Sequence, residues 1–442
     1  MTAPARLGGG DGDAGEGHRH EPGAAPADGR EVERAPRLRP PLRQVGVLAA
    51  LTLLTRLPGL VTGRSFNTDE ATLGIGGRAM AAGGELYVDV LDRKPPLPFL
   101  AYRVVGTDDL RLVRALVAIL ILATAVVLAD EARRRWGGRA GWVAGLVVVL
   151  GSSALGPNDA QAANFELFAL LPIAVAVVAA ARGWAATAGV ALAVAVLCKQ
   201  PAAVTIVPVA WCWWRTGRWA ATVRGLVAGG VAGLALMAPF GIGRVLDWAL
   251  LGTGGYLGME ASDLGFAAGR LAALVGLAVA FWGGAWLLAA APRAAGGRAE
   301  VAVGRRHEDL DLWLLLGASV VGVVAGFRFF PHYLVQLLPA LALLAARGAT
   351  RRPAWVRPAV AWAVVASLAG AGLAWQVAVT DAPDVETSLA AHARRTTDAG
   401  DRILVWGNVP EVYWLADRQP AGGFTHSEFV TGYSGGRRPR TT

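Results

Sequence analysis

Two adjacent acids and a lysine are the residues of this chain best suited to chemistry. Asp69 and Glu70 stand next to each other, and Lys94 follows later in the same polar stretch, directly before two prolines. A carboxylate can accept a proton from a hydroxyl group, and an ammonium group can stabilise an anionic leaving group. The chain has only two lysines, Lys94 and Lys199, among many arginines. Because proline fixes the backbone, the two prolines are expected to aim Lys94 back toward the start of the stretch.

The acidic pair also has a purely structural interpretation. Asp69 and Glu70 come just before a helical stretch, 71–82, and acids at a helix N-terminus complement its dipole and cap its free N–H groups. The catalytic interpretation is favoured by position, because the pair follows the first apolar run and shares its loop with Asp92 and Arg93. We therefore take Asp69 and Glu70 as catalytic candidates, and Asp92 and Arg93 as substrate-binding candidates.

A second acid and the second lysine lie at the ends of later apolar runs. Glu166 begins one such run, where burying a carboxylate is costly, so a functional or paired role is expected. Asp159, slightly earlier, is expected to be solvated. Lys199 lies in a turn between two short runs, and two interpretations stay open: it snorkels to the interface, or it binds an anion.

A third cluster follows at 328–333, with the sequence Arg-Phe-Phe-Pro-His-Tyr. One interpretation is an interfacial aromatic belt with an anchoring arginine. Arg328 is also suited to a phosphate group, because its planar guanidinium can bind two oxygens at once. His332 and Tyr333 are substrate-binding candidates, and spacing completes no metal site around His332.

Motif searches exclude several classes of enzyme. The sequence has no phosphate-binding P-loop, no His-Glu zinc helix and no Gly-x-Ser-x-Gly motif in a suitable context. No cofactor is predicted, and a divalent metal is compatible with the sequence but not indicated by it.

Composition places the chain in a membrane. Of its 442 residues, 54% are hydrophobic and only 17% are charged, and the apolar residues come in runs about as long as a bilayer core is thick. The net charge of +9 does not indicate a nucleic-acid partner, because the arginines lie in short loops, as the positive-inside rule requires. The sequence therefore predicts an all-α polytopic membrane protein.

The apolar runs predict about eleven spans, at 45–61, 110–130, 140–156, 165–181, 184–198, 201–214, 223–240, 270–291, 310–327, 332–346 and 357–379. With alternating spans, the arginine-rich loops after residues 130, 214, 291 and 346 all fall on one face, which the positive-inside rule makes cytoplasmic. The candidate residues then all lie on the opposite, extracytoplasmic face, where neither ATP nor nucleotide sugars are available.

Three regions are predicted. Residues 1–40 are expected to be a disordered cytoplasmic tail, and 41–380 a transmembrane domain whose first outer loop is 62–109. Residues 381–442 are expected to form a small extracytoplasmic α/β appendage, with helices at 385–397 and 409–417 around a strand at 402–407.

The chain resembles the GT-C superfamily of glycosyltransferases that use lipid-linked sugars. Its motifs are most similar to the bacterial family 39-type branch, which is related to protein O-mannosyltransferases and to the aminoarabinose transferases of lipid A. The resemblance covers roughly 45–430. It rests on Asn67-Thr68-Asp69-Glu70, on Gly84-Glu85-Leu86-Tyr87-Val88-Asp89 leading into Asp92-Arg93-Lys94-Pro95-Pro96-Leu97, on Asn164-Phe165-Glu166, and on Arg328-Phe329-Phe330-Pro331-His332-Tyr333-Leu334. The late segment Val405-Trp406-Gly407-Asn408, with Tyr413, also resembles the post-membrane segment of actinobacterial-type members. Glu166 stands where many relatives have an aspartate, and eleven spans are fewer than the thirteen of some relatives.

The resemblance implies a GT-C-like helical bundle and an inverting sugar transfer in the cell envelope. The donor would be a polyprenyl-phosphate sugar, and the acceptor a hydroxyl group of an extracytoplasmic protein, polysaccharide or lipid. Asp69 would be the catalytic carboxylate and Lys94 a contact to the donor phosphate, with Arg328 and Lys199 as further phosphate contacts. A phosphate leaving group needs fixed positive charge rather than a general acid. A membrane transporter or flippase, or a non-catalytic polyprenyl-phosphate-binding protein, is the alternative.

Overall fold

The apolar runs of the sequence fold into helices, because only internally hydrogen-bonded backbone can lie within a bilayer. The computed structural model describes residues 41–215, 219–251, 264–291, 309–380 and 385–427. Each of the eleven predicted spans coincides with helical structure, namely α1 (Leu42–Val61), α4 (Leu110–Trp136), α5 (Gly138–Ser153), α7 (Phe165–Ala181), α8 (Ala185–Cys198), η1 (Gln200–Thr205) with α9 (Ile206–Arg215), α10 (Trp219–Met237), α13 (Leu264–Ala289), α15 (Leu310–Val324), η6 (Pro331–Leu337) with α16 (Leu338–Arg351), and α17 (Val356–Val379). The predicted tail, 1–40, lies outside the described residues.

The described helices make this a multi-pass membrane protein. Within the described ranges, six helical segments are long and apolar enough to cross a bilayer, and α5, α7, α8 and α15 are apolar but shorter. The number of crossings stays a prediction, because the short helices and α9 meet the bilayer thickness only if they combine with neighbouring turns.

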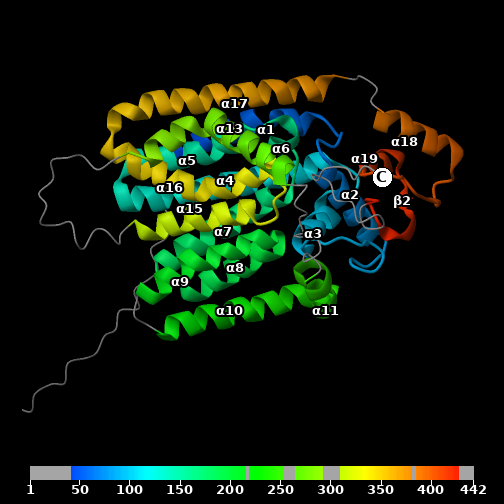
Figure 1. Ribbon diagram of the computed structural model, residues 1–442, viewed down its shortest axis with the longest axis horizontal. Coiled ribbons are helices and arrows are strands. Elements are labelled where there is room, and N and C mark those ends of the chain that lie inside the picture. The colour runs from blue at the N-terminus through cyan, green and yellow to red at the C-terminus, as the bar shows by residue number, and fades with distance from the viewer. Residues whose placement is uncertain (1–40, 216–218, 252–263, 292–308, 381–384, 428–442) are drawn as a thin grey trace, which may run out of the picture. The chain divides into compact units, whose positions relative to one another are not determined.

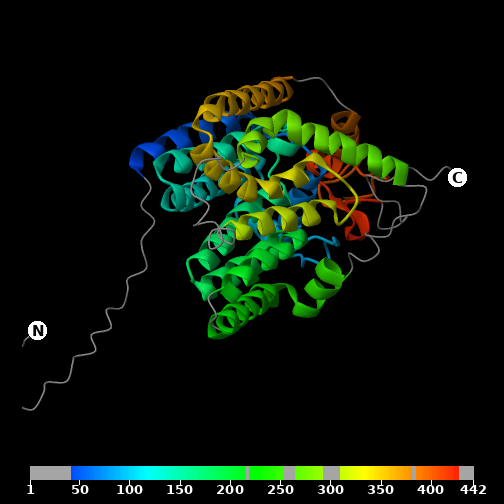
Figure 2. The same ribbon diagram turned by 60° about the vertical axis from the view of Figure 1, so that its left-hand side comes forward.

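The helices differ in how deeply they are packed. The segment formed by η6 and α16 is 89% buried, so it lies at the centre of the bundle. The segments that contain α10 and α17 are only 17% and 22% buried. Exposed apolar side chains on α10, such as Val227 and Val231, therefore face the lipid. Figures 1 and 2 show the long helices side by side, with α10 and α17 at the margins.

The first outer loop contains more structure than expected. The predicted helix at 71–82 is present as α2 (Thr68–Ala81), which begins slightly earlier than expected. A second helix, α3 (Pro96–Val105), was not predicted; it begins at a proline, which is favourable at the first helical position. A short helix, α6 (Pro157–Ala160), occupies the second outer loop. All three lie at the same end of the bundle (Figure 1).

The described C-terminal residues form two helices and a minimal sheet. Helices α18 (Val385–Thr396) and α19 (Glu411–Ala416) confirm the two predicted helices. The predicted strand 402–407 is wrong beyond its first two residues. Strand β1 (Arg402–Ile403) pairs in parallel with β2 (Gln419–Pro420), and proline ends the ladder because it has no N–H to donate. In Figure 1 these elements lie beside α2, and α19 contacts α2 directly.

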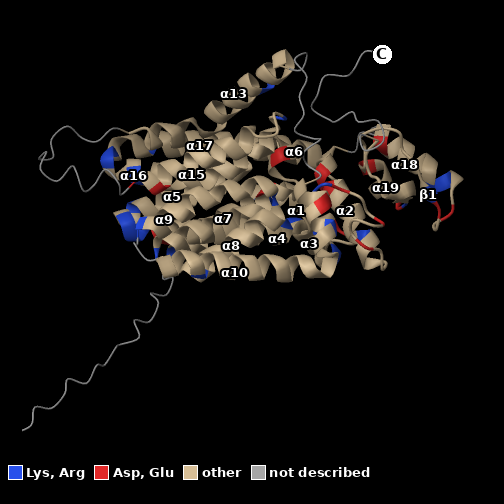
Figure 3. Cartoon of the chain, turned by 60° about the horizontal axis from the view of Figure 1, so that its bottom comes forward, with Lys and Arg blue, Asp and Glu red and all other residues tan. Residues whose placement is uncertain are grey.

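The two ends of the bundle differ in their charged side chains. Lysines and arginines gather where α9 and α16 end, whereas acidic side chains mark α2 and α6 at the opposite end (Figure 3). Ion pairs join the helix ends at the arginine-rich end, from Arg135 to Asp311 at 2.8 Å and from Arg182 to Asp130 at 3.0 Å. The described arginines of the loops after residues 130, 214 and 346 therefore gather at one end of the bundle. The predicted loop after residue 291 lies outside the described residues, so its side stays a prediction.

Candidate active site

Helix α2 holds Asp69 at its N-terminus. The helix starts there because the Asn67 side chain caps it, accepting a hydrogen bond from the backbone N–H of Glu70 at 2.8 Å. Asp69, in the first turn, is favoured by the helix dipole and is 22% exposed. Its Oδ1 lies 2.6 Å from Nζ of Lys94. The first outer loop therefore folds back so that its lysine meets its acid.

The loop that carries Lys94 is fixed on both sides of the lysine. The backbone N–H of Lys94 donates to Asp92 Oδ1 at 3.1 Å, and its carbonyl accepts from the Tyr87 hydroxyl at 2.8 Å. Tyr87 itself has a left-handed φ of 69°, which few residues other than glycine adopt. After the lysine, Pro95 and Pro96 begin α3. These contacts give Asp92 a role in shaping the loop.

A second ion pair lies beside the first. Glu166 in the first turn of α7 is 1% exposed and pairs with Lys199, which ends α8. Both lysines lie over the ring of Phe165, whose centroid is 4.9 Å from Nζ of Lys94 and 6.0 Å from Nζ of Lys199. The ring of Tyr333 lies 4.3 Å from Nζ of Lys199. Glu166 is therefore paired, as expected of a buried carboxylate.

His332 lies within 4.0 Å of the carboxylates of both ion pairs. Its Nε2 lies 3.6 Å from Asp69 Oδ2 and 3.9 Å from Glu166 Oε1. Its other ring nitrogen, Nδ1, lies 2.8 Å from Asp159 Oδ1, which also accepts the backbone N–H of His332 at 3.1 Å. The Phe330 ring stacks on the imidazole with centroids 5.5 Å apart. Asp159, expected to be solvated, instead orients His332.

The cluster keeps Asp69 ionised. Burial raises the pKa of its carboxyl group, but the positive charges of Lys94, His332 and Lys199 outweigh burial, and the net pKa lies well below the usual range. Asp69 is thus an anion with cations around it, on α2 at the end of the bundle opposite the arginine-rich end.

Glu70 faces away from this cluster. It is fully buried and accepts two hydrogen bonds from Arg114 of α4, at 2.8 and 2.6 Å. It also accepts the backbone N–H groups of Phe66 and Ala163, both at 2.9 Å. Four hydrogen bonds to the carboxylate tie α2 to α4 and to the second outer loop. Glu70 therefore fixes the position of α2 and does not face the same space as Asp69.

Two other predicted residues, Arg93 and Arg328, belong to segments that also carry residues of this cluster, Lys94 and His332. Arg93 presents its carbonyl to the Gln200 side chain at 2.7 Å, which ties the Lys94 loop to the Lys199 turn. Arg328 is 1% exposed and lies between Phe327 and Phe329, which both have a left-handed φ. The unusual backbone fixes this turn directly before η6, which carries His332.

The sequence did not point to two C-terminal residues that reach α2. His426 Nε2 lies 3.0 Å from the Thr72 hydroxyl, although the two are 354 residues apart. Glu411 of α19 forms a side-chain hydrogen bond with Thr68 and lies within electrostatic range of Asp69. Burial, assisted by Lys94, lowers the pKa of His426 to about 3. No local sequence motif marks either residue, because each comes close to Asp69 only through the packing of the C-terminal residues on α2.

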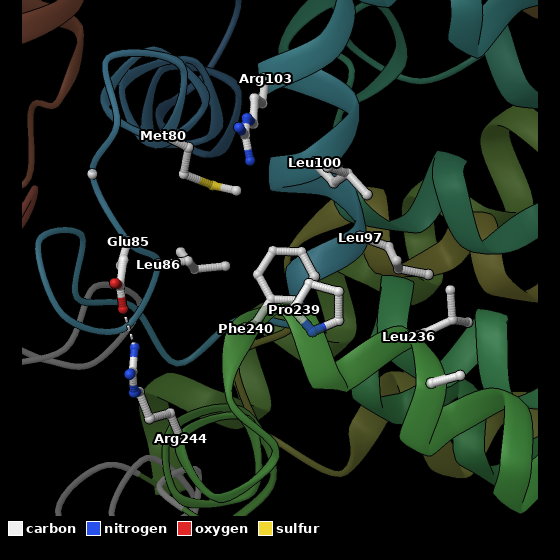
Figure 4. Close-up of a pocket in the computed structure, with 12 residues that line it drawn as sticks. Met80, Glu85, Leu86, Leu97, Leu100, Arg103, Leu236, Pro239, Phe240 and Arg244 are labelled. Atoms are coloured by element: carbon white, nitrogen blue, oxygen red, sulfur yellow. Dashed lines mark hydrogen bonds and ion pairs between the residues drawn. The ribbon is translucent and has the colours of Figure 1, made fainter.

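A cavity of about 270 Å³ lies between the first outer loop with α3 and the end of α10. Figure 4 shows Leu86, Leu97 and Leu100 of the first loop facing Leu236 and Phe240, at the end of α10 and in the following turn. At its edge, Arg244 forms an ion pair with Glu85 (Figure 4). The cavity is therefore mainly apolar with charged groups at its edge. Among the described side chains, no group of three or more His, Cys, Asp and Glu residues is placed to hold a metal ion.

Comparisons with known proteins give a structural match only. No protein-family model matches the sequence, and neither does any curated protein. The fold is similar to the crystal structure of ArnT from Cupriavidus metallidurans bound to undecaprenyl phosphate, with a TM-score of 0.59 and 16% identity over 90% of each chain. It is also similar to the same protein in the apo state, with a TM-score of 0.57 and 15% identity over 86% of this chain and 85% of that one.

Proposed function

Because the chain has the fold of the GT-C superfamily of glycosyltransferases, we propose that it is a membrane glycosyltransferase that uses a polyprenyl-phosphate-linked sugar. The sugar passes to an acceptor hydroxyl group on the extracytoplasmic side, with inversion at the anomeric carbon. One observation carries the proposal: the ionised Asp69 lies against Lys94 and beside His332, at the end of the bundle that is opposite the arginine-rich end. Undecaprenyl phosphate bound to ArnT is the kind of lipid expected here as carrier.

The leaving group needs positive charge. When the bond between the anomeric carbon and the phosphate oxygen breaks, the oxygen keeps the electron pair and the phosphate gains negative charge. Lys94 and Lys199, which both lie over the ring of Phe165, supply fixed charge for that oxygen, and Arg328 is the third proposed contact. Phosphate is a good leaving group once so stabilised, so no general acid is required.

The acceptor needs a base on the opposite face of the sugar. Asp69 accepts the proton of the acceptor hydroxyl as the new carbon–oxygen bond forms, and a single displacement inverts the anomeric centre. Glu70, predicted as a second catalytic acid, has a positioning role in this mechanism because Arg114 and two backbone N–H groups occupy it. Asp159 holds the imidazole of His332 toward both carboxylates.

The cavity between the first outer loop and α10 suits the lipid of the donor. Its leucines accept the first isoprene units, while the phosphate stays beside Lys94, only three positions before the cavity residue Leu97. The sugar and the acceptor macromolecule are not assigned by these residues.

Sugar transfer in proteoliposomes tests the proposal. Wild type and Asp69→Asn are supplied with radiolabelled undecaprenyl-phosphate sugars and a crude envelope extract, and Asp108→Asn serves as a matched control because Asp108 is exposed in the same outer region. We expect wild type and the control to transfer label, and Asp69→Asn to lose at least about 100-fold of the rate, since it removes the base. Stabilisation by undecaprenyl phosphate should survive in all three.

Two results would contradict the proposal. Equal transfer by Asp69→Asn and wild type removes Asp69 from the mechanism. Binding of undecaprenyl phosphate without transfer of any supplied sugar favours a lipid-binding protein or a flippase instead.

A further inference from the structure

Two cations lie close to the carboxylate of Asp69, and they are held in different ways. Lys94 pairs with Oδ1 at 2.6 Å, whereas Nε2 of His332 lies 3.6 Å from Oδ2. The side chain of Lys94 is 28% exposed, but that of His332 is only 9% exposed. A lysine also has a flexible four-carbon stem, which can carry its charge to a new partner. Lys94 is therefore the cation that can be exchanged.

His332, by contrast, is fixed by its surroundings. Its ring Nδ1 and its backbone N–H both bond to Oδ1 of Asp159, at 2.8 and 3.1 Å. The Phe330 ring stacks on the imidazole with an interplanar angle of 8°, and the Tyr333 ring lies edge-on to it with centroids 5.0 Å apart. The imidazole cannot turn without breaking its bond to Asp159, so Nε2 stays directed at the carboxylates.

The charges of the cluster balance when His332 is an imidazolium. A carboxylate only accepts hydrogen bonds, so Asp159 requires a proton on Nδ1. Nε2 faces two further carboxylates, at 3.6 and 3.9 Å, and a proton there places the positive charge among three acids. Within the cluster, three cations then face three carboxylates, namely Lys94, Lys199 and His332 against Asp69, Asp159 and Glu166.

Further charged groups belong to the elements packed on η6 and on α2. They are Arg328 before η6, Arg270 of α13 against the Phe330 ring, Glu411 of α19 and His426, with Asp311, Arg347 and Arg351 at the arginine-rich ends of α15 and α16. All of them are the same in every variant used below, so a comparison of variants isolates the charge at position 332.

The proposed reaction draws Lys94 from Asp69 to the donor phosphate. Without a second cation, Asp69 would then be a partly buried carboxylate that has lost its counter-ion, which is unfavourable. His332 faces the other carboxylate oxygen, so it keeps Asp69 ionised and oriented while Lys94 is engaged. Catalytic hydrogen bonds are often long in a free enzyme and tighten once the substrate is bound, and the 3.6 Å separation fits such a contact.

We propose that His332 is a positioning residue of the reaction: as an imidazolium held by Asp159, it is the counter-ion that stays with Asp69 when Lys94 moves to the donor phosphate. The inference rests on the proposed glycosyltransferase function and divides the work of the two cations. Lys94 is exchanged between the acid and the phosphate, whereas His332 is not. His332, predicted as a substrate-binding residue, then acts through Asp69, and no bond or proton changes at its ring during transfer.

The pH dependence of kcat tests the inference, because it reports the donor complex, whereas that of kcat/KM reports the free enzyme. Transfer from radiolabelled undecaprenyl-phosphate sugar to envelope extract is measured in proteoliposomes against pH at saturating donor. His332→Gln and His332→Asn both remove the charge, so one serves if the other does not fold, and His332→Lys keeps a charge. His392→Gln is the matched control, because it makes the same change at an exposed position of α18. Thermal stabilisation by undecaprenyl phosphate shows that each variant is folded.

We expect the acid limb of kcat to move upward by about 1–2 pH units in the uncharged variants, because loss of a nearby cation raises the pKa of Asp69. The plateau of kcat should fall by about tenfold, since Asp69 is less well oriented. In His332→Lys the acid limb should stay near that of wild type. The donor KM should change by less than about twofold in these variants, because His332 does not bind the phosphate. His392→Gln should behave like wild type.

Two results would overturn the inference while leaving the glycosyltransferase intact. An acid limb of kcat that stays in place in the uncharged variants would show that His332 is not the counter-ion of Asp69 in the donor complex. A donor KM raised by about tenfold or more, with the acid limb in place, would put His332 on the substrate instead. Failure of wild type to transfer sugar would be a failure of the proposed function, and the inference would fall with it.

Discussion

At the scale of single residues, the position of Lys94 decides how basic Asp69 is. In this structure Nζ of Lys94 lies 2.6 Å from Asp69 Oδ1, and together with His332 and Lys199 it holds the pKa of the carboxyl group well below its ordinary value of about 4. A carboxylate held so acidic is a weak base. In the proposed mechanism the donor phosphate draws Lys94 away, so Asp69 would regain basicity when the acceptor hydroxyl must be deprotonated.

The pH dependence of transfer should show this coupling. Because the pKa of Asp69 is depressed in the folded protein, its carboxylate stays ionised as pH falls below about 4, the ordinary pKa of an aspartate. The ion pair with Lys94 therefore stabilises the fold at pH values above the pKa of Asp69 in the unfolded chain. This stabilisation is lost as pH falls through the pKa of Asp69 in the folded protein. Lys94→Met removes this cation from the free enzyme, so we expect the acid limb of kcat/KM for the donor to move upward by about 1–2 pH units, with a raised donor KM. The measurement is kcat/KM for the donor against pH, with Arg111→Met as a control for the loss of an exposed cation in the same region. An acid limb that stays in place would show that Asp69 is not the titrating base.

The same residues show what a sequence can and cannot reveal. Asp69, Lys94 and Glu166 could be selected because acids and lysines are rare near membrane-spanning runs and costly to bury. The partner of each could not be selected, because pairs such as Lys199 with Glu166 depend on how distant helices meet. Asp159 appeared solvated because its partner, the imidazole of His332, comes from η6.

At the scale of elements, α2 is fixed by its neighbours. Glu70 and Arg114 form a buried ion pair, with exposed fractions of 0% and 3%, that joins α2 to α4. Helix existence was predictable from periodicity, and all eleven predicted runs are helical. Helix α3 and the short strand β1 were not predicted correctly, because a loop helix of ten residues and a two-residue ladder depend on tertiary contacts more than on propensity.

The neighbouring acids Asp69 and Glu70 form a natural matched pair of variants. Glu70→Gln leaves the Arg114 charge buried without its counterion, so we expect a loss of about 3–5 kcal/mol of stability. Asp69→Asn changes a partly exposed carboxylate, so its effect on stability should be about 1 kcal/mol or less. Thermal unfolding in detergent measures both. If Glu70→Gln unfolds like wild type but transfers no sugar, Glu70 acts in the chemistry and our positioning role is wrong.

The cavity between the first loop and α10 can be tested by filling it. Leu236→Trp places a larger side chain in the cavity, whereas Val231→Trp changes the same helix at an exposed, lipid-facing position. We expect Leu236→Trp to raise the donor KM by about tenfold, the cost of leaving one to two methylene groups unburied, and Val231→Trp to have no effect. An equal effect of both variants, or of neither, would place the lipid elsewhere.

At the scale of the whole molecule, the two ends of the bundle have opposite electrostatic character. Arg135 and Arg182 pair with acids at the ends of α4 and α15, and Arg351 pairs with Asp309 at 2.8 Å at the end of α16. Asp69 and its partners lie at the other end, where α2 and α6 are (Figure 3). The positive-inside rule counts lysines and arginines in short loops, so we expect the arginine-rich end to be cytoplasmic. The site then opens outside the cytoplasm, which is where a lipid-linked sugar donor is required.

Cysteine labelling in intact cells measures this orientation. Both native cysteines, Cys198 and Cys212, are buried, so they give a low background. Asp398→Cys introduces an exposed thiol at the end that carries the candidate site, and Arg139→Cys introduces one at the arginine-rich end. We expect a membrane-impermeant maleimide to label the first variant in intact cells and the second only after permeabilisation, because arginine-rich loops stay in the cytoplasm. The reverse pattern would place Asp69 on the cytoplasmic side, where an extracytoplasmic acceptor cannot reach it, and would exclude the proposed reaction.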